Sequence, residues 1–250
     1  MGIWQRELTN VNDEETIFFD TKYAYKFANG VFQEFIPGTT WNGSDANFFW
    51  AANFRGSTAQ SKRFFVTNFI NDANNPMRYT DGTTWTSFFP RITSTGTVNY
   101  LTQARILIPY YGRLIALNVW ESPDNGAGAP NFGAGVQIPN RCRFSQIGDP
   151  TDQTNGWLSD VFGRGGFIDA PTSESIISAT FYKNTLIVFF ERTTWQLRYQ
   201  GDYGIPFIWE RISSDFGSES TFSSVLFDQG VTAIGDRAID RDWETINVFL

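Results

Sequence analysis

Any acid–base chemistry of this sequence would have to rely on carboxylates. The 250 residues contain no histidine and one cysteine, Cys142, which excludes Ser-His-Asp and Cys-His nucleophiles and imidazole zinc sites. Glycoside hydrolysis needs two carboxyl groups about 5 to 10 Å apart. Six acids of the second half could supply them: Asp169, Glu174, Glu191, Glu210, Asp215 and Glu219. Acids also occur on any surface, so we assign no catalytic residue and expect a protein that is not an enzyme.

Three short segments resemble ligand loops, and each is better explained as a turn. Thr80-Asp-Gly-Thr-Thr-Trp85 comes near the Asp-box hairpin of sialidase propellers but lacks the residue between Asp and Gly. Gly163-Arg-Gly-Gly166 lacks the Lys and Ser/Thr of a phosphate loop. Asp149-Pro-Thr-Asp-Gln-Thr-Asn-Gly156 offers oxygen ligands, but Thr151 and Gln153 stand where a calcium loop needs Asp or Asn. We therefore expect no metal and no cofactor.

Three arginines, Arg78, Arg143 and Arg198, recur beside an aromatic residue and lead into Gly-containing turns. In a sialidase, three arginines would clamp a substrate carboxylate. We instead expect each arginine at an outer-face strand position, where it would stabilise the packing of repeated units or pair with another subunit.

Composition limits the partners and the compartment. A net charge of −7 and a pI near 4.7 argue against a sequence-independent phosphate binder. No stretch reaches the roughly 18 apolar residues of a membrane span, and the longest apolar region, 176–190, is broken by Lys183 and Asn184. Residues 1–10 contain no apolar signal core. We expect synthesis in the cytoplasm and one domain over residues 1–250.

The elements that must position these side chains are strands. Tyr23, Tyr25 and Phe27 alternate with other residues, as do Trp195 and Leu197, which is the period of a half-buried strand. Continuous apolar runs at 105–111 and 185–190 are typical of strands buried on both faces. Turn dipeptides separate the runs, among them Asn29-Gly30, Asp81-Gly82 and Tyr111-Gly112. The fold class is predicted to be all-β.

Strands and turns recur as a unit of about 40 to 50 residues, which is typical of propeller blades. Tyr110-Tyr-Gly-Arg-Leu-Ile115 matches Tyr182-Lys-Asn-Thr-Leu-Ile187, and the units are centred near 16–41, 48–90, 104–162, 176–212 and 222–249. These units predict a β-propeller of about five blades. Pairing of the N- and C-terminal strands would close the ring and remove two exposed edges, so we expect the termini to meet. A two-sheet sandwich is the alternative.

The longest spacer, residues 121–138, is rich in Gly, Ala, Asn and Pro. An unstructured loop of this length in a compact domain is usually functional or mobile. We expect it to project from the body and to contact a partner.

Five segments from Tyr110 onwards resemble propeller-type tail proteins of tailed bacteriophages, including the nozzle of short-tailed phages. They are the hairpin Tyr-x-Gly-Arg-Leu-Ile-Ala-Leu ending at Leu117, Asn-Arg-Cys-Arg-Phe-Ser-Gln-Ile-Gly-Asp-Pro at 140–150, Gly-Gly-Phe-Ile-Asp-Ala-Pro at 165–171, a second hairpin, and Glu-Arg-Thr-Thr-Trp-Gln-Leu-Arg-Tyr-Gln-Gly at 191–201. The resemblance covers about residues 104–240. Residues 240–250 depart from the blade pattern of the family, which usually continues past the position of Asp236.

The resemblance implies a structural component of a phage virion, such as a nozzle, tail tube or adaptor-like protein. Its partners would be other tail or head–tail adaptor proteins in a homo-oligomeric ring, with DNA only as passing cargo during ejection. A net negative charge suits DNA transit, because a basic lumen would hold the phosphates. The alternative is a carbohydrate-binding or glycoside-cleaving propeller. A WD-type scaffold fits less well because the Gly-His and Trp-Asp signatures are missing.

Overall fold

The computed structural model of the chain describes residues 2–7, 14–35, 40–44, 47–56, 62–228, 230–239 and 242–248. In these ranges the secondary structure is strand apart from one 3-10 helix, η2 (Phe132–Ala134). The all-β prediction is therefore confirmed. Of residues 240–250, where the sequence departs from the family's blade pattern, only 242–248 are described.

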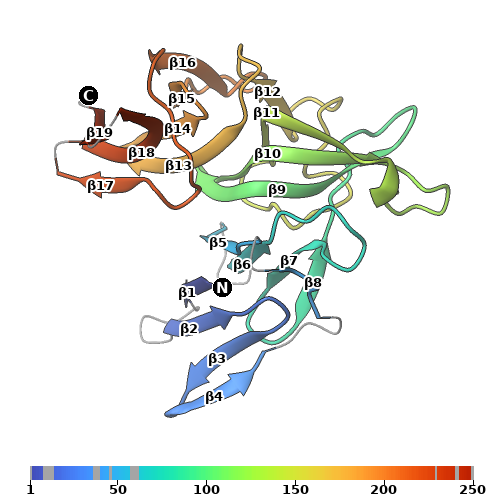
Figure 1. Cartoon of the computed structure of the whole chain (residues 1–250). Coiled ribbons are helices and arrows are strands. Elements are labelled where there is room, and N and C mark those ends of the chain that lie inside the picture. Colours follow the sequence, from blue (N-terminus) through green and yellow to red (C-terminus); the bar gives the residue numbers. More distant parts are fainter. Residues whose placement is uncertain are drawn as a thin grey trace. The chain divides into compact units, whose positions relative to one another are not determined.

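The described strands form five separate antiparallel sheets that follow one another along the chain (Figure 1). The first sheet consists of β1 (Gly2–Glu7), β2 (Glu14–Phe19), β3 (Ala24–Ala28) and β4 (Val31–Glu34). The second sheet consists of β5 (Trp50–Phe54), β6 (Arg63–Thr67), β7 (Met77–Thr80) and β8 (Trp85–Phe88). The third sheet consists of β9 (Asn99–Tyr110), β10 (Arg113–Pro123), β11 (Val136–Phe144) and β12 (Gly166–Asp169).

The last two sheets occupy the C-terminal part. The fourth sheet consists of β13 (Ile176–Tyr182), β14 (Thr185–Phe190), β15 (Thr194–Tyr199) and β16 (Phe207–Ser213). The fifth sheet consists of β17 (Val225–Phe227), β18 (Gly230–Ile239) and β19 (Asp242–Val248). Each sheet keeps its strands in chain order, so each strand pairs with its sequence neighbour. The predicted pairing of the N- and C-terminal strands is not found among the described strands, because β1 pairs with β2 and β19 pairs with β18 in different sheets.

The chain divides into two compact units. One comprises Met1–Ile138 with Arg143–Phe167, and the other comprises Pro139–Cys142 with Ile168–Leu250. The first unit contains the first and second sheets, β9 and β10, and the second unit contains the fourth and fifth sheets. Strands β11 and β12 contribute residues to both units.

In the first unit, the second sheet is buried on both faces. Phe64 and Val66 of β6 belong to the core shared with the first sheet, whereas Phe65 belongs to the core shared with the third sheet. Successive side chains of a strand point to opposite faces. A strand covered on both sides therefore needs a continuous apolar run, and β6 (Arg-Phe-Phe-Val-Thr) supplies one.

The two cores of the first unit are largely aromatic. The core between the first and second sheets contains Phe19, stacked on Phe49 with ring centroids 4.8 Å apart, and Trp41, whose ring lies edge-on to Phe49 at 5.2 Å. The core between the second and third sheets contains Phe88, which contacts Trp157 at 5.8 Å. Large rings fill the space between facing sheets with few side chains.

In the second unit, the fourth and fifth sheets pack together through apolar side chains. Ile187 and Phe189 of β14 lie in one cluster with Val231 and Ala233 of β18. In each strand the residue between the two, Val188 in β14 and Thr232 in β18, points to the other face and lies outside the cluster. The period-2 pattern thus decides which side chains meet between these sheets.

Two of the turn dipeptides form tight hairpins, whereas Asp81-Gly82 lies in a four-residue connection between β7 and β8. Asn29 and Gly30 both have positive φ angles, 54° and 79°, and so have Tyr111 and Gly112, at 47° and 71°. Two consecutive positive φ angles are the requirement of the type I′ turn, whose twist matches that of the flanking strands. β3 and β4, and likewise β9 and β10, are therefore joined by two residues.

The spacer at 121–138 is not an unstructured loop, which corrects the expectation from composition. Strand β10 continues to Pro123, β11 begins at Val136, and an antiparallel bridge joins Asp124 to Pro130 between them. The Asp124 carboxylate accepts hydrogen bonds from the Gly126 and Gly128 amides at 2.6 and 3.3 Å. Composition does not predict this ordered turn, because the turn depends on the hydrogen bonds of one side chain, Asp124.

Candidate functional site

Two of the six candidate acids, Glu191 and Glu219, line one pocket of about 450 Å³ in the second unit. Ile177 of β13, Arg192 and Ser218 complete the lining. Glu191 and Arg192 follow directly after β14, and Ser218 and Glu219 belong to the segment between β16 and β17. The pocket is therefore formed where that segment returns to the end of β14.

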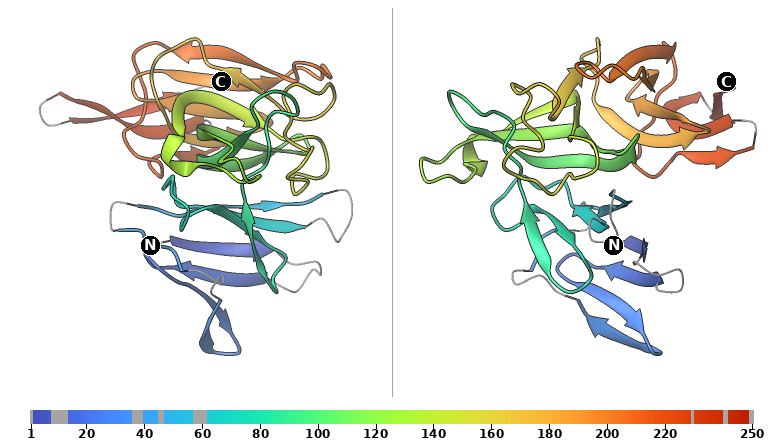
Figure 2. Two further views of the ribbon diagram at one scale, coloured as in Figure 1. Left: turned by 90° about the vertical axis from the view of Figure 1, so that its right-hand side faces the viewer. Right: turned by 180° about the vertical axis from the view of Figure 1, so that it is seen from behind.

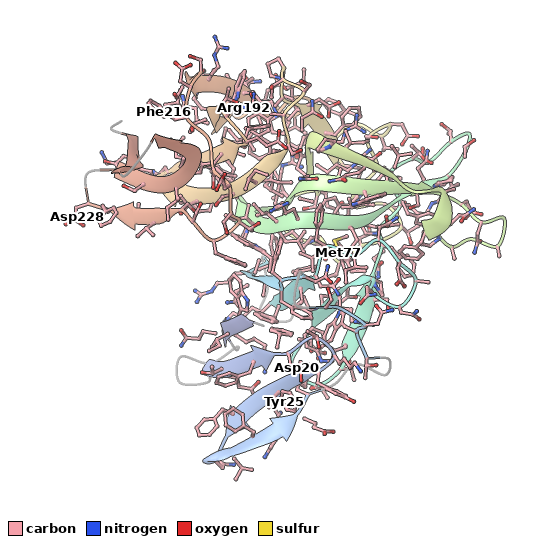
Figure 3. The ribbon with its side chains drawn as sticks, viewed as in Figure 1. Asp20, Tyr25, Met77, Arg192, Phe216 and Asp228 are labelled. Atoms are coloured by element: carbon pink, nitrogen blue, oxygen red, sulfur yellow. The ribbon has the colours of Figure 1, made fainter. Side chains whose placement is uncertain are left out.

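Close backbone packing holds the returning segment in place. Ser218 N donates to Phe190 O at 2.8 Å, and Glu219 N donates to Ile234 O at 3.1 Å. A Cβ on Gly217 would collide with Phe190 O and with the backbone at Glu191 and Arg192. Figure 3 labels Arg192, which lines the pocket, and Phe216, which precedes Gly217 in the chain. Glycine at 217 thus allows the two carboxylates to share one pocket.

The pocket places two carboxylates beside one guanidinium, with Glu191 and Arg192 exposed to solvent. Such a set can accept and donate hydrogen bonds to a polar ligand such as a sugar. Among the described residues, no group of three or more His, Cys, Asp or Glu side chains is placed to hold a metal ion. The arrangement is thus a polar surface pocket with one possible carboxylate pair.

Two more of the candidate acids hold structural contacts. Asp169 forms a two-point ion pair with Arg141, with Nε–Oδ1 and Nη2–Oδ2 distances of 2.7 and 2.8 Å. Glu174 accepts three hydrogen bonds at the turn between β14 and β15, from the amides of Arg192 and Thr193 at 3.0 Å and from the Thr193 hydroxyl at 2.9 Å. Both carboxylates therefore fix local backbone and strand geometry.

The last two candidate acids lie on the last strand of the fourth sheet and just after it. Glu210 on β16 pairs with Arg198 on β15 at 2.6 Å and accepts from Gln196 at 2.6 Å. Asp215 accepts from the hydroxyl of its neighbour Ser214 at 3.2 Å. Of the six acids, only Glu191 and Glu219 share the pocket lining.

The Asp-box-like segment is the hairpin turn between β7 and β8, as expected. Asp81 Oδ1 accepts from the amides of Thr83 and Thr84 at 2.9 and 3.3 Å, and these bonds lower the pKa of Asp81. Gly82 has a φ of 105°, and the guanidinium of Arg6 lies directly against its Cα. Arg6 is itself held by Glu15. The segment stabilises the contact between the first and second sheets.

The other two ligand-like segments are also turns. Asp152 Oδ1 accepts from the amides of Thr154 and Asn155 at 3.2 and 3.0 Å, and the Gly156 amide donates to Asp152 O at 2.9 Å. Gly163 has a φ of 80° in the loop that precedes β12. In that loop the Arg164 amide donates to Val161 O at 3.2 Å, so both segments close backbone turns.

The three recurring arginines occupy equivalent strands, because β7, β11 and β15 are each the third strand of a sheet in chain order. The expected outer-face exposure is wrong for two of them. Arg78 is 2% exposed and lies over the Trp41 ring at 4.6 Å, and burial lowers its pKa to about 10. Arg143 is 3% exposed and lies over Phe167 at 5.0 Å. Only Arg198 is exposed, because aromatic neighbours cover the other two.

One contact that the sequence did not indicate joins two loops of the first unit. The carboxylate of Asp160 accepts hydrogen bonds from the amides of Ser94 and Thr95 at 2.8 and 3.1 Å and from both hydroxyls. Burial acts to raise the pKa of Asp160, but these bonds outweigh it and lower the pKa. Asp160 lies 65 and 66 positions away from its partners, so no local sequence pattern predicts this pairing.

Fold and site together define an all-β protein of consecutive antiparallel sheets whose arginines and acids largely serve internal contacts. Compared with known proteins, the sequence matches no family model and no curated protein. Within the described ranges, no helix has the length and apolar character needed to cross a membrane.

Proposed function

We propose that this chain is a structural component of a bacteriophage tail, a nozzle, tube or adaptor-like protein built as a β-propeller of about five blades. The observation that carries the proposal is the succession of five chain-ordered antiparallel sheets, with facing sheets in each unit packed through apolar clusters. Propeller blades are four-stranded sheets of this kind. The sequence resemblance from Tyr110 onwards points to the tail.

The use of charged side chains supports a mechanical role. Buried arginines such as Arg78 and Arg143 lie on aromatic rings, and carboxylates such as Asp81 and Asp160 close turns. Contacts of this kind stiffen a sheet protein and leave few charged groups poised for chemistry. A virion protein that transmits force and guides DNA needs stiffness, and its net charge of −7 limits retention of the phosphates.

Mass spectrometry and cryo-electron microscopy of purified particles test the proposal. We expect peptides of this chain in washed virions of the phage that encodes it, and density for its sheets in the tail. Tail density fully explained by other chains would reject the proposal.

The Glu191 and Glu219 pocket favours a second candidate, a glycan-binding or glycoside-cleaving propeller. A glycan array and a chromogenic glycoside panel test it with the wild type, Glu191→Gln and Glu219→Gln. A glycosidase would lose at least about 100-fold of its activity in each variant. Glu210→Gln is the matched control, because Glu210 pairs with Arg198 outside this pocket. The structural proposal predicts no hydrolysis by any of the four proteins.

A further inference from the structure

The sequence contains four Asn-Gly pairs, a setting in which asparagine can modify itself. Asparagine is a thermolabile residue, because the main-chain nitrogen of the next residue can attack its side-chain carbonyl carbon. A following glycine leaves that nitrogen accessible, since glycine has no Cβ. The local chemistry is the same in all four pairs, so their surroundings in the fold decide which one reacts first. The pairs are Asn29-Gly30, Asn42-Gly43, Asn125-Gly126 and Asn155-Gly156.

In two of the pairs a backbone hydrogen bond restrains the attacking nitrogen. Gly43 N donates to Thr21 O at 3.1 Å, and Gly156 N donates to Asp152 O at 2.9 Å. The packing around Gly156 is also tight, because a Cβ there would lie 2.7 Å from Asp152 O. An N–H held in this way reaches the asparagine carbonyl carbon only after the bond has opened, and such local opening requires free energy.

The third restrained pair lies in the turn that Asp124 organises. Gly126 N donates to Asp124 Oδ1 at 2.6 Å, and the Asn125 side chain accepts from Ala127 N at 2.8 Å. Both reacting groups of this pair are therefore engaged, although Asn125 and Gly126 are exposed to solvent. Exposure alone thus does not decide which pair reacts.

The fourth pair, Asn29 and Gly30, forms the exposed end of the β3–β4 hairpin. Among the described residues, no hydrogen bond engages the Gly30 amide or the Asn29 side chain. A Cβ on Gly30 would meet no atom within 4 Å. Both views of Figure 2 show this hairpin extending from the rest of its sheet. The two groups that must meet are therefore surrounded by solvent.

The end of this hairpin should also open more easily than the other three sites. The type I′ turn holds Asn29 at a φ of 54°, so the attack requires the turn to open first. β4 is an edge strand of the first sheet, all four of its residues are exposed, and Phe32 is 60% exposed. Opening interrupts the pair next to the turn, Ala28 with Val31. Segments with few buried contacts open at low free energy.

We propose that Asn29 is the residue at which the folded chain modifies itself, by deamidation to aspartate and isoaspartate. The Gly30 nitrogen forms a bond to Cγ of Asn29, the Cγ–Nδ2 bond breaks, and Nδ2 leaves as ammonia with the proton of the Gly30 amide. Water then opens the resulting succinimide ring. Its attack at Cγ gives aspartate, and its attack at the main-chain carbonyl carbon gives isoaspartate. Asparagine and water thus become the acid and ammonia, with no oxidation or reduction.

Isoaspartate at this position would loosen the edge of the first sheet. Its main chain passes through Cβ and Cγ, so the connection between β3 and β4 gains one atom and a carboxylate. The type I′ turn needs two residues with positive φ angles, and the lengthened connection no longer meets that requirement. Ala28 and Val31 would then lose their pairing. The age of each molecule would be recorded at β4.

Ageing of the full chain in neutral buffer, followed by digestion and peptide mass spectrometry, is the first test. Electron-transfer dissociation distinguishes isoaspartate from aspartate. We expect Asn29 to deamidate at least about tenfold faster than the asparagine of any other Asn-Gly pair in the native chain, and the four rates to agree within about threefold in denaturant. Equal native rates at the four sites, or a faster reaction at another pair, would overturn the proposal.

Release of a restrained pair is the second test. Asp124→Ala removes the acceptor of the Gly126 amide, so Asn125 should deamidate at least about fivefold faster than in the wild-type chain. Asp124→Asn is the matched control, because its amide oxygen can still accept this bond. Each native rate is divided by the rate of the same variant in denaturant, which removes the effect of the changed neighbour. An unchanged Asn125 rate in Asp124→Ala would overturn hydrogen bonding as the reason for the selectivity.

Hydrogen exchange of the isoaspartate fraction measures the effect on the hairpin. The amides of β4 should exchange at least about tenfold faster than in the unmodified chain, and those of β6 should not change. Unchanged exchange in β4 would contradict the loss of pairing. These experiments need neither virions nor glycans, so their failure would leave the proposed structural role untouched.

Discussion

Arg143 forms a two-point ion pair with Glu121 across neighbouring strands of the third sheet. The Nε–Oε1 and Nη2–Oε2 distances are 2.6 and 3.0 Å, and the side chains are 3% and 14% exposed. A guanidinium and a carboxylate fit one another in this planar, bidentate geometry. Phe167 covers the guanidinium from one side. Glu121 therefore supplies a close and largely buried carboxylate for the charge of Arg143.

Removal of that partner should be costly. Glu121→Ala is expected to lower the free energy of unfolding by about 3 kcal/mol, because it removes the carboxylate paired with a buried guanidinium. Urea denaturation followed by tryptophan fluorescence measures the change. Glu210→Ala, which breaks the exposed pair with Arg198, is the matched control and should cost about 1 kcal/mol or less. Equal losses in both variants would contradict the importance of burial.

Gly82 should not tolerate a side chain. Its φ of 105° disfavours an L-residue, and an added Cβ would overlap the guanidinium of Arg6. Gly82→Ala is expected to cost at least about 2 kcal/mol, from backbone strain and displacement of Arg6 from Glu15. Gly96→Ala is the control, because Gly96 also has a positive φ, 71°, but open space around it. Thermal unfolding should show a clearly smaller loss for Gly96→Ala.

The contact of Asp160 should make the free energy of unfolding fall at acid pH. Its pKa in the folded chain lies below the ordinary value of 3.8. The contribution of Asp160 is therefore fully present above pH 4 and is lost as the pH falls through the lowered pKa. Asp160→Asn should flatten this part of the stability profile, and Ser94→Ala should flatten it less because three of the donors remain. Unfolding midpoints of the three proteins between pH 2 and 6 measure this dependence. Identical pH profiles for the wild type and Asp160→Asn would refute the role of this contact.

Cys142 should report unfolding. It is buried, and burial raises the pKa of its thiol, so little reactive thiolate reaches solvent at neutral pH. Labelling by a thiol reagent should be at least about 1,000-fold slower in the native chain than in denaturant, because it requires opening. A Phe32→Cys variant is the control and should label one additional thiol at once. Rapid labelling of the native wild type would contradict the burial.

Local sequence chemistry predicted the all-β class, the hairpin turns and the recurrence of the three arginines on strands. Tyr111-Gly112 and Asn29-Gly30 specify their turns through their own φ preferences, so no distant residue is needed. The face of an arginine was harder to predict. Arg78 and Arg198 occupy equivalent strands, yet only Arg78 is covered by a ring, that of Trp41, 37 positions away in the chain.

The candidate site likewise depends partly on residue types and partly on contacts between distant segments. The sequence named Glu191 and Glu219 among six acids without a reason to pair them, and the return of the segment around Gly217 to the end of β14 decided that they share a pocket. The sequence also suggested an unstructured loop at 121–138, whereas in the structure Asp124 orders a turn there.

By itself, the sequence determined the strand period, the turn types and the exclusion of histidine and thiolate-cluster chemistry, because these depend on residue identity and near neighbours. Only the tertiary structure decided which faces are covered, which charges are paired and which apolar faces stay bare. Burial is a property of a side chain together with its distant neighbours, as Phe19 in the core and Phe32 on the bare face of the same sheet demonstrate.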